Sequence, residues 1–243
     1  MRINKFLSET GVCSRRTADQ WIAAGRVSVN GNIAALGTKV EDGDEVALDG
    51  RPVGWKPERV YIALHKPRGI ECTTNRTVAH NIIDFVGHKE RVFPIGRLDK
   101  SSEGLILLTN DGDIVNRVLR AEHEHEKEYV VVVDRPLTPA FLAGMAGGVP
   151  ILETVTNPCR VEQLGRNTFR IVLTQGLNRQ IRRMCEHFEF NVRRLQRLRI
   201  MHIELGRLPV GRWRDLTKFE VRPLLSPPEK RRPRGSPAWP KDR

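Results

Sequence analysis

Four short runs of β-branched and aromatic residues constrain the fold of this chain most strongly. They lie at 60–64 (VYIAL), 105–108 (LILL), 129–133 (YVVVV) and 169–173 (FRIVL). Residues of these types favour β-strands because their side chains pack well on a pleated surface. Each run has the length of a strand, far below the roughly 20 apolar residues that a membrane helix needs. The chain is therefore predicted to form a sheet and not to span a membrane.

Two helices are predicted between these strands. Asp113 begins the first, whose apolar residues share one face. Thr138 followed by Pro139 is typical of the cap and first turn of the second. Because strands and helices are mixed along residues 59–225, we expect this region to fold as one α+β domain.

The first 50 residues predict a separate module. Ser14 is placed to cap a short helix that Gly25 would end. The segment RVSVNG at 26–31 then alternates apolar and polar residues before an Asn-Gly turn, which is typical of a hairpin. We therefore expect an independent domain at 1–50, with the Pro- and Gly-containing stretch at 51–58 as its linker.

The charge of the chain indicates its class of partner. It carries 41 Lys and Arg against 29 Asp and Glu, which gives a formal net charge of +12. Such a surplus favours nucleic acid or an anionic surface, and it argues against an acidic-tail or metal-buffering protein. The segment 226–243 holds six basic residues and five prolines, and is predicted to be a disordered tail. No signal peptide is recognisable, and four scattered cysteines fit neither disulfides nor zinc, so we expect a cytoplasmic protein.

The helix predicted after Gly176 separates apolar from basic residues. Its apolar stripe, at positions i, i+3, i+4 and i+7, consists of Ile181, Met184, Cys185 and Phe188. The arginines on and after this helix lie off the stripe, with Arg182 at its edge; they are Arg179, Arg182, Arg183, Arg193, Arg194, Arg197 and Arg199. One interpretation is an ordinary helix with a solvated basic face. The use of arginine rather than lysine favours the other, a nucleic-acid surface.

Residue types alone leave three further positions open. Asp99 lies in a polar loop between two apolar segments, and it is either a turn residue or a functional carboxylate. Tyr129 heads a predicted strand and is either a core residue or part of a site. The run HEHEKE at 123–128 is interpreted as a solvated loop rather than a metal site, because it lacks the i, i+4 spacing of helical ligands.

Four motifs, in this order, resemble those of a known enzyme family. GRLDKSSEGL at 96–105 resembles the catalytic motif of the RsuA/RluB/RluE/RluF family of bacterial RNA pseudouridine synthases. ALHKPRG at 63–69, KEYVV at 127–131 and GLNRQIRRM at 176–184 resemble its other motifs, the last most closely in the RluF branch. Residues 1–50 are similar to an S4 RNA-binding domain. The resemblance covers nearly the whole chain apart from the tail.

This resemblance implies an α+β protein in which a small S4-type domain precedes a catalytic domain with a mixed, mostly antiparallel central sheet. It implies isomerisation of uridine to pseudouridine in structured RNA, with 23S ribosomal RNA and a transfer-RNA anticodon loop as expected substrates. The reaction is neither a redox step nor a hydrolysis, so no cofactor or metal is expected. One alternative is a non-catalytic RNA-binding or ribosome-assembly protein. Another is an RNA nuclease or transferase that uses the residues at 123–126.

The resemblance also implies roles for single residues. Asp99 is expected to act on the ribose, either as a nucleophile at C1′ or as a base that removes the 2′ proton. Arg182, or secondarily Arg179, would keep that carboxylate ionised, and Tyr129 would stack on the extruded base. We expect a monomer with Asp99 at the floor of a cleft across the sheet. Its expected RNA contacts are Arg97, Lys66, Arg179 and Arg183, with Arg2, Lys5, Arg15, Arg16 and Arg26 in the S4 domain.

Overall fold

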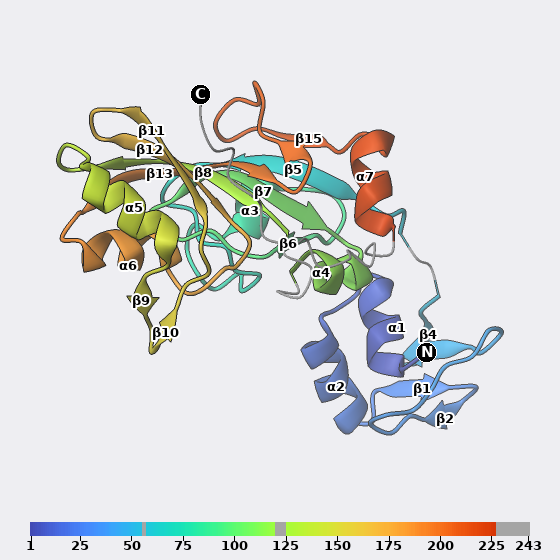
Figure 1. The fold of residues 1–243 in the computed structure, drawn as a ribbon. Coiled ribbons are helices and arrows are strands. Elements are labelled where there is room, and N and C mark those ends of the chain that lie inside the picture. Colours follow the sequence, from blue (N-terminus) through green and yellow to red (C-terminus); the bar gives the residue numbers. More distant parts are fainter. Residues whose placement is uncertain (55–56, 120–124, 227–243) are drawn as a thin grey trace.

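The computed structural model describes residues 1–54, 57–119 and 125–226, so the predicted tail beyond Ser226 lies outside the described residues. The N-terminal part packs two helices on a small sheet of order β2-β1-β3-β4 (Figure 1). Its elements are α1 Ile3–Glu9, α2 Arg15–Ala23, β1 Val27–Val29, β2 Asn32–Ile33, β3 Val46–Leu48 and β4 Arg51–Pro52.

The local signals predicted for this domain are confirmed. Ser14 Oγ accepts a hydrogen bond from the Thr17 amide at 3.0 Å and caps α2. Asn30 and Gly31, between β1 and β2, have φ angles of 50° and 79°, which suit a two-residue hairpin turn. The linker predicted at 51–58 begins later than expected, because Arg51–Pro52 pairs with β3 as strand β4.

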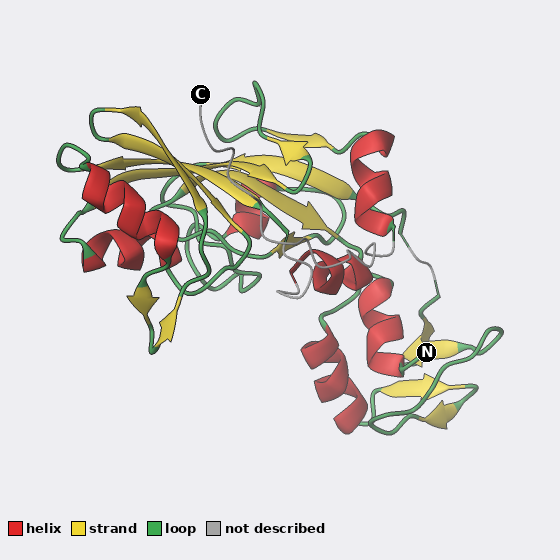
Figure 2. Cartoon of the chain, in the orientation of Figure 1, coloured by secondary structure: helices red, strands yellow, loops and turns green. Residues whose placement is uncertain are grey.

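The second domain is built on a nine-stranded sheet. Its main path runs β11-β12-β8-β13-β7-β5-β15, with β6 paired to β7 and β14 to β13 (Figure 2). Among the strand pairs of the described residues only β13 and β7 are parallel, so the predicted mixed, mostly antiparallel sheet is confirmed. The strands are β5 Tyr61–Lys66, β6 Phe93–Ile95, β7 Glu103–Thr109, β8 Lys127–Val133, β11 Arg160–Gly165, β12 Thr168–Leu173, β13 Val192–Ile200, β14 Ile203–Glu204 and β15 Trp213–Asp215.

Helices cover both faces of this sheet. Alternation along β5 shows the two sides, since Ile62 and Leu64 belong to the larger core while Ala63 belongs to the smaller one. Helices α3, α5 and α6 contribute to the larger core, and α4 and α7 to the smaller one (Figure 1). The remaining elements are α3 Ile82–Val86, α4 Gly112–Leu119, α5 Pro139–Gly147, β9 Pro150–Ile151, β10 Thr154–Val155, α6 Gln180–His187 and α7 Lys218–Leu225.

The parallel contact between β7 and β13 depends on Gly104. This glycine has a φ of +110°, and a Cβ placed on it would overlap the backbone of Arg197 on β13. Only a residue without a side chain lets the two backbones come so close. Because Gly104 lies at the start of β7, directly after the loop that carries Asp99, the same contact fixes the C-terminal end of that loop.

We expect Gly104→Ala to lower the free energy of unfolding by about 3 kcal/mol or more, because it adds both a steric overlap and a strained φ. Urea denaturation followed by circular dichroism measures this change. Gly112→Ala is the matched control, since a Cβ there meets nothing within 4 Å. An effect of Gly104→Ala no larger than that of the control would show that the close approach is not needed.

The last helix is anchored by one carboxylate. Glu220 pairs with Arg214, with 2.6 Å between Oε1 and Nη2, and it completes a capping box with Thr217 at the start of α7. These bonds, that from Arg214 first, lower the pKa of Glu220 from 4.5 to about 2. A depressed folded-state pKa stabilises the fold above the unfolded-state value, and that stability is lost as the pH falls toward the folded-state value.

Glu220→Gln is therefore expected to destabilise the protein by about 1 kcal/mol at neutral pH. The difference from wild type should shrink as the pH falls from about 4.5 and vanish near 2, because protonated Glu220 has already lost its ion pair. Urea denaturation of both proteins across this range provides the measurement. A difference that is independent of pH would contradict the ionic origin of the stabilisation.

Candidate active site

The loop between β6 and β7 carries Asp99 and is held by the segment that follows β5. The Leu98 amide donates to Cys72 Sγ at 3.4 Å, and the Gly69 amide donates to the Lys100 carbonyl at 2.8 Å. Within the loop, the Ser102 amide donates to the Asp99 carbonyl at 3.0 Å. These bonds fix the backbone on both sides of Asp99, whose side chain remains 33% exposed. The carboxylate is thus held in place and still open to a ligand.

Lys66 holds the same loop from below, and its predicted contact with RNA is wrong. Its side chain is fully buried, and Nζ donates to the Ser102 carbonyl at 2.8 Å and to the Pro67 carbonyl at 2.9 Å. Burial lowers the pKa of Lys66, although the nearby charge of Asp99 opposes this shift. An ammonium enclosed in this way binds the protein's own backbone and offers nothing to a phosphate.

Arg182 reaches Asp99 from helix α6. Its Nε lies 3.7 Å from Asp99 Oδ2, while Nη2 donates to Ser102 Oγ at 3.2 Å and Nη1 donates to the Val192 carbonyl at 3.3 Å. Nε itself is buried and has no hydrogen-bond partner among the described residues. Burial lowers the pKa of Arg182, and the positive charge of Arg179 lowers it further. The guanidinium is therefore fixed through its two Nη atoms, and its Nε is the atom that lies next to the carboxylate.

Arg182, predicted at the edge of the apolar stripe of its helix, is buried, with only 8% of it exposed. Arg179 is exposed and lies second nearest to Asp99, with Nη1 4.0 Å from Oδ2. It precedes α6 with a left-handed φ of 51°. Arg183 binds its own loop, with Nε donating to the Asn178 carbonyl at 3.1 Å. The three arginines of this helix thus have three different environments.

Tyr129 lies on β8 and faces the larger core, where it is 9% exposed. Leu98, beside Asp99, and Ile181, beside Arg182, belong to the same cluster of buried side chains. Tyr129 therefore shares one buried core with the residues next to Asp99 and Arg182, although strand, loop and helix are far apart in the sequence.

The predicted RNA contacts divide into exposed and paired residues. Lys5 forms an ion pair with Asp113 on α4, 2.7 Å away, so it joins the two domains. Arg26 is bound by Asp49, whose Oδ1 accepts from Nε at 2.9 Å. Both side chains remain partly exposed, Lys5 at 32% and Arg26 at 44%, so their contacts with RNA stay predictions. Besides Arg26 and Arg179, the predicted RNA contacts that are exposed are Arg2, Arg15, Arg16 and Arg97.

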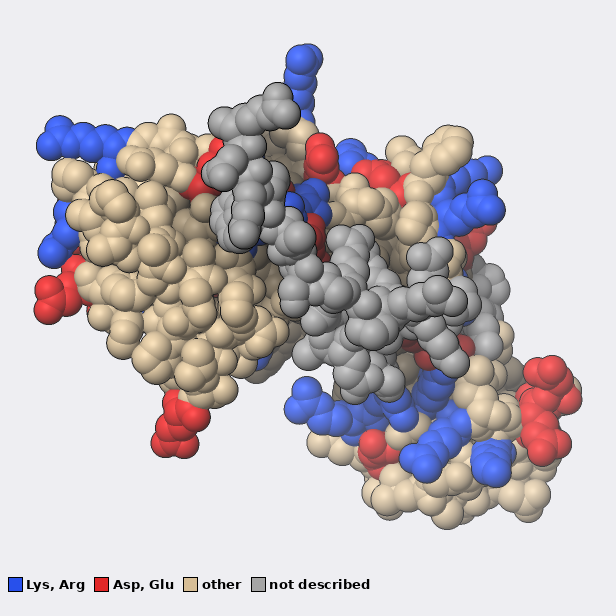
Figure 3. Space-filling model, in the orientation of Figure 1, with Lys and Arg blue, Asp and Glu red and all other residues tan. Residues whose placement is uncertain are grey.

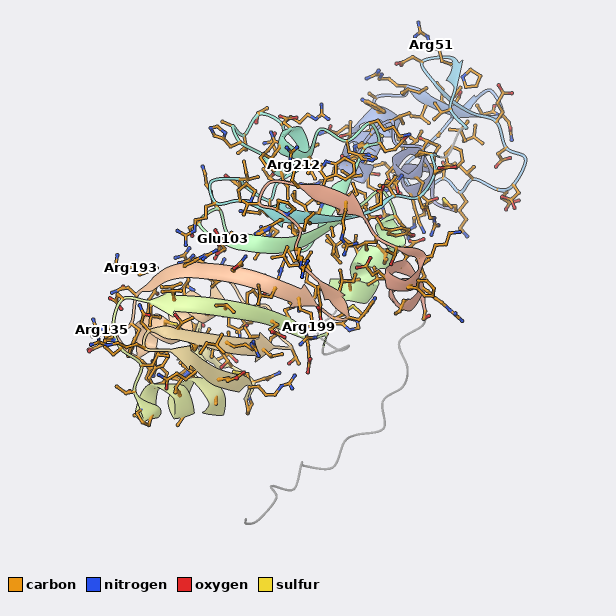
Figure 4. All side chains as sticks on the ribbon, turned by 90° about the horizontal axis from the view of Figure 1, so that it is seen from above. Arg51, Glu103, Arg135, Arg193, Arg199 and Arg212 are labelled. Atoms are coloured by element: carbon orange, nitrogen blue, oxygen red, sulfur yellow. The ribbon has the colours of Figure 1, made fainter. Side chains whose placement is uncertain are left out.

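The arginines after α6 also differ from the predicted basic surface. Arg194 Nε donates to Glu103 Oε1 at 2.6 Å, and Arg199 Nε donates to Glu128 Oε2 at 3.0 Å. Figure 4 shows Glu103 beside β13 at the end that carries Arg193, with Arg199 toward its other end. Arg197 is buried. Sequence analysis missed these partners because the carboxylates come from strands distant in the sequence.

Charge is also unevenly distributed over the surface of the N-terminal domain. Figure 3 shows lysine and arginine side chains gathered on the part of this domain nearest to the second domain, with acidic side chains at its outer edge. The basic side chains thus lie on the side where an RNA could contact both domains. This arrangement agrees with a nucleic acid partner.

A separate cavity of about 520 Å³ lies between β14 and α7. Three of its polar groups bind one another, since Arg214 pairs with Glu220 and His202 Nε2 lies 2.8 Å from the Glu220 carbonyl. These contacts anchor α7, so we regard this cavity, whose lining also includes Glu204 and Arg207, as a weaker candidate than Asp99. The described residues contain no cluster of three or more metal-ligating side chains, and His123 and Glu124 lie outside them.

Comparison with known proteins is consistent across the chain. The family model for RNA pseudouridylate synthase matches residues 60–187, and that for the S4 domain matches residues 1–46. The chain is 54% identical over 223 residues to the dual-specificity RNA pseudouridine synthase RluF of Escherichia coli (strain K12), covering 91% of this chain and 77% of that protein.

Two further matches extend over nearly the full length. The ribosomal large subunit pseudouridine synthase B of Bacillus subtilis (strain 168) is 35% identical over 232 residues, which cover 92% of this chain and 95% of that one. A crystal structure of a pseudouridylate synthase aligns with a TM-score of 0.68 at 28% identity, covering 93% of this chain and all of the other. Among the described residues, no helix is both long and apolar enough to cross a membrane.

Proposed function

Since the chain belongs to the RNA pseudouridylate synthase family and isomerises uridine to pseudouridine in RNA, we propose that Asp99 carries out this reaction on ribosomal and transfer RNA. The substrate proposal is supported by two relatives, one named for dual specificity and the other for the large ribosomal subunit. The assignment of Asp99 is supported above all by its position, partly exposed and 3.7 Å from the fixed guanidinium of Arg182.

The reaction requires one carboxylate. It is an isomerisation, so the substrate and the product contain the same atoms. The bond between C1′ and N1 breaks and its electron pair stays on the base, which turns so that C5 can bond to C1′. The proton on C5 then leaves, and N1 gains a proton. Asp99 either adds to C1′ and is later displaced, or removes the 2′ proton and returns it. Both routes need an ionised carboxylate, and a cation beside it favours that state.

Three other side chains have roles in this proposal. Arg182 holds Asp99 in place and balances its charge, with Arg179 as a second cation at 4.0 Å. Tyr129 offers an aromatic face to the base, which must leave its stack in the RNA before it can turn. Its hydroxyl is proposed to accept the proton that leaves C5. Leu98 and Ile181, from the same core, would pack under the ring.

RNA binding is proposed to rest on arginines of both domains. Arg2, Arg15 and Arg16 would contact phosphates from the S4 domain, and Arg97, Arg179 and the partly buried Arg183 would do so from the second domain. Several phosphate contacts release several counterions, so affinity should fall steeply with salt. We further propose a monomer that acts in the cytoplasm and needs no metal. A chelator would therefore leave the activity unchanged, whereas it would stop a metal-dependent nuclease or transferase.

The target RNAs can be identified by mapping pseudouridines in cells with and without the gene. We expect specific sites in large-subunit ribosomal RNA and in one transfer RNA to disappear with the gene and to return when it is restored. Loss of sites from ribosomal RNA alone would show that the transfer-RNA part of the proposal is wrong. Unchanged maps for both RNAs would refute the substrate proposal.

A further inference from the structure

Arg197 is a buried cation that the mechanism described so far does not use. It lies on β13 with 3% of its surface exposed, and its Nε donates to the Leu105 carbonyl on β7 at 2.7 Å. Its Nη2 is buried and has no hydrogen-bond partner, and no carboxylate pairs with it within the described ranges. A buried donor without a partner is unfavourable, so a group that accepts a hydrogen bond from it would bind more tightly.

The side chain of Arg197 lies on the same face of the sheet as Tyr129. The two residues are directly paired across the antiparallel strands β13 and β8, where opposite Cβ atoms are about 4.5–5.5 Å apart. Leu195, two residues earlier on β13, belongs to the same buried cluster as Tyr129. Arg197 is therefore the buried cation at the strand position next to Tyr129, on which the base is proposed to stack.

Other charges around Arg197 leave an excess of positive charge beneath this region. Burial lowers the pKa of both Lys66 and Lys127, and the charge of Arg197 lowers each further. Burial raises the pKa of the Cys72 thiol, which the charges of Lys66 and Arg197 lower and that of Asp99 raises. The charges of Arg197 and Asp99 thus both act on the pKa of the same thiol, that of Cys72. Glu103, the other carboxylate nearby, already binds Arg194 and Arg68.

The isomerisation creates a negative charge for which such a cation is suited. When the bond to C1′ breaks, the electron pair left on N1 spreads to the O2 and O4 carbonyl oxygens of uracil. We propose that Arg197 is a catalytic residue that donates a hydrogen bond through Nη2 to one of these oxygens while the base is detached. This inference rests on the proposed function. In this proposal Arg197 stabilises the detached base, whereas Asp99 acts on the ribose. Arg197 gives up no proton, so the proton balance of the reaction is unchanged.

Arg197→Lys tests this role, because lysine keeps the charge and one donor for the Leu105 carbonyl but loses the second arm. We expect the single-turnover rate to fall about 100-fold, as for the loss of one donor to a developing oxyanion, with the Kd for RNA nearly unchanged. Arg197→Gln keeps a donor for Leu105 and removes the charge, so it should be at least as slow. Arg199→Lys, on the same strand but bound by Glu126 and Glu128, is the matched control and should keep the wild-type rate.

Substrates with sulfur in place of O2 or O4 separate contact from structure, because sulfur accepts hydrogen bonds weakly. At the contacted position, this replacement should slow wild type more than Arg197→Lys, with a difference of about tenfold. A merely structural role would give equal sulfur effects in both proteins at both positions, and that result, or a wild-type rate for Arg197→Lys, would overturn the inference. If the proposed function itself were wrong, the wild-type protein would make no pseudouridine, so this failure can be told apart from failure of the Arg197 role.

Discussion

Asp99→Asn is expected to abolish pseudouridine formation while RNA binding persists. The amide has nearly the shape of the carboxylate, but it can neither add to C1′ nor remove a 2′ proton. Removal of such a group costs about 10⁴-fold in rate or more. The affinity for RNA should not fall, because the substitution removes a negative charge that repels phosphates. Single-turnover assays and binding titrations with the same RNA provide the two measurements.

Asp215→Asn is a suitable control, because this aspartate is exposed at the end of β15 and takes no part in the proposed site. It should keep both the wild-type rate and the wild-type Kd. If Asp99→Asn formed product at the wild-type rate, the assignment of the reacting carboxylate would be wrong. Loss of binding together with activity would instead indicate that Asp99 holds the loop in place for RNA.

Arg182→Gln has the second largest expected effect on the reaction. The substitution removes the cation 3.7 Å from Asp99 and the donors to Ser102 and Val192. A fixed charge at a reacting centre contributes about 10²–10³-fold, so we expect the single-turnover rate to fall by this factor. Stability should also fall, by about 1–3 kcal/mol, because buried acceptors lose their donor. Rates measured well below the melting temperature separate the two effects.

Arg166→Gln provides the comparison for the loss of one positive charge, since Arg166 is exposed and lies in no proposed contact. It should change the rate and the stability little. Arg182→Gln with a wild-type rate would show that Asp99 needs no partner from α6, and Arg179 would then be the cation to test.

Local sequence signals predicted the elements of this fold well. The cap at Ser14, the turn at Asn30 and Gly31, and the cap at Thr138 all appear as expected, because each depends on residues within four positions of one another. The family resemblance named Asp99, Tyr129 and Arg182, and the fold brings Asp99 and Arg182 together. Residue types alone had left Asp99 and Tyr129 undecided.

The sequence by itself determined four strands of the large sheet, the helices that begin near Ser14, Asp113, Thr138 and Gly176, and that the chain belongs with RNA-binding enzymes. Only the tertiary structure decided which basic residues are free. Lys66 is enclosed by its own loop, Lys5 binds Asp113 more than 100 positions away, and Arg197 is buried at the β7–β13 contact. Whether a cation contacts water, a carboxylate or a carbonyl depends on segments that only folding brings together. The spacing of residues along the chain therefore does not predict it.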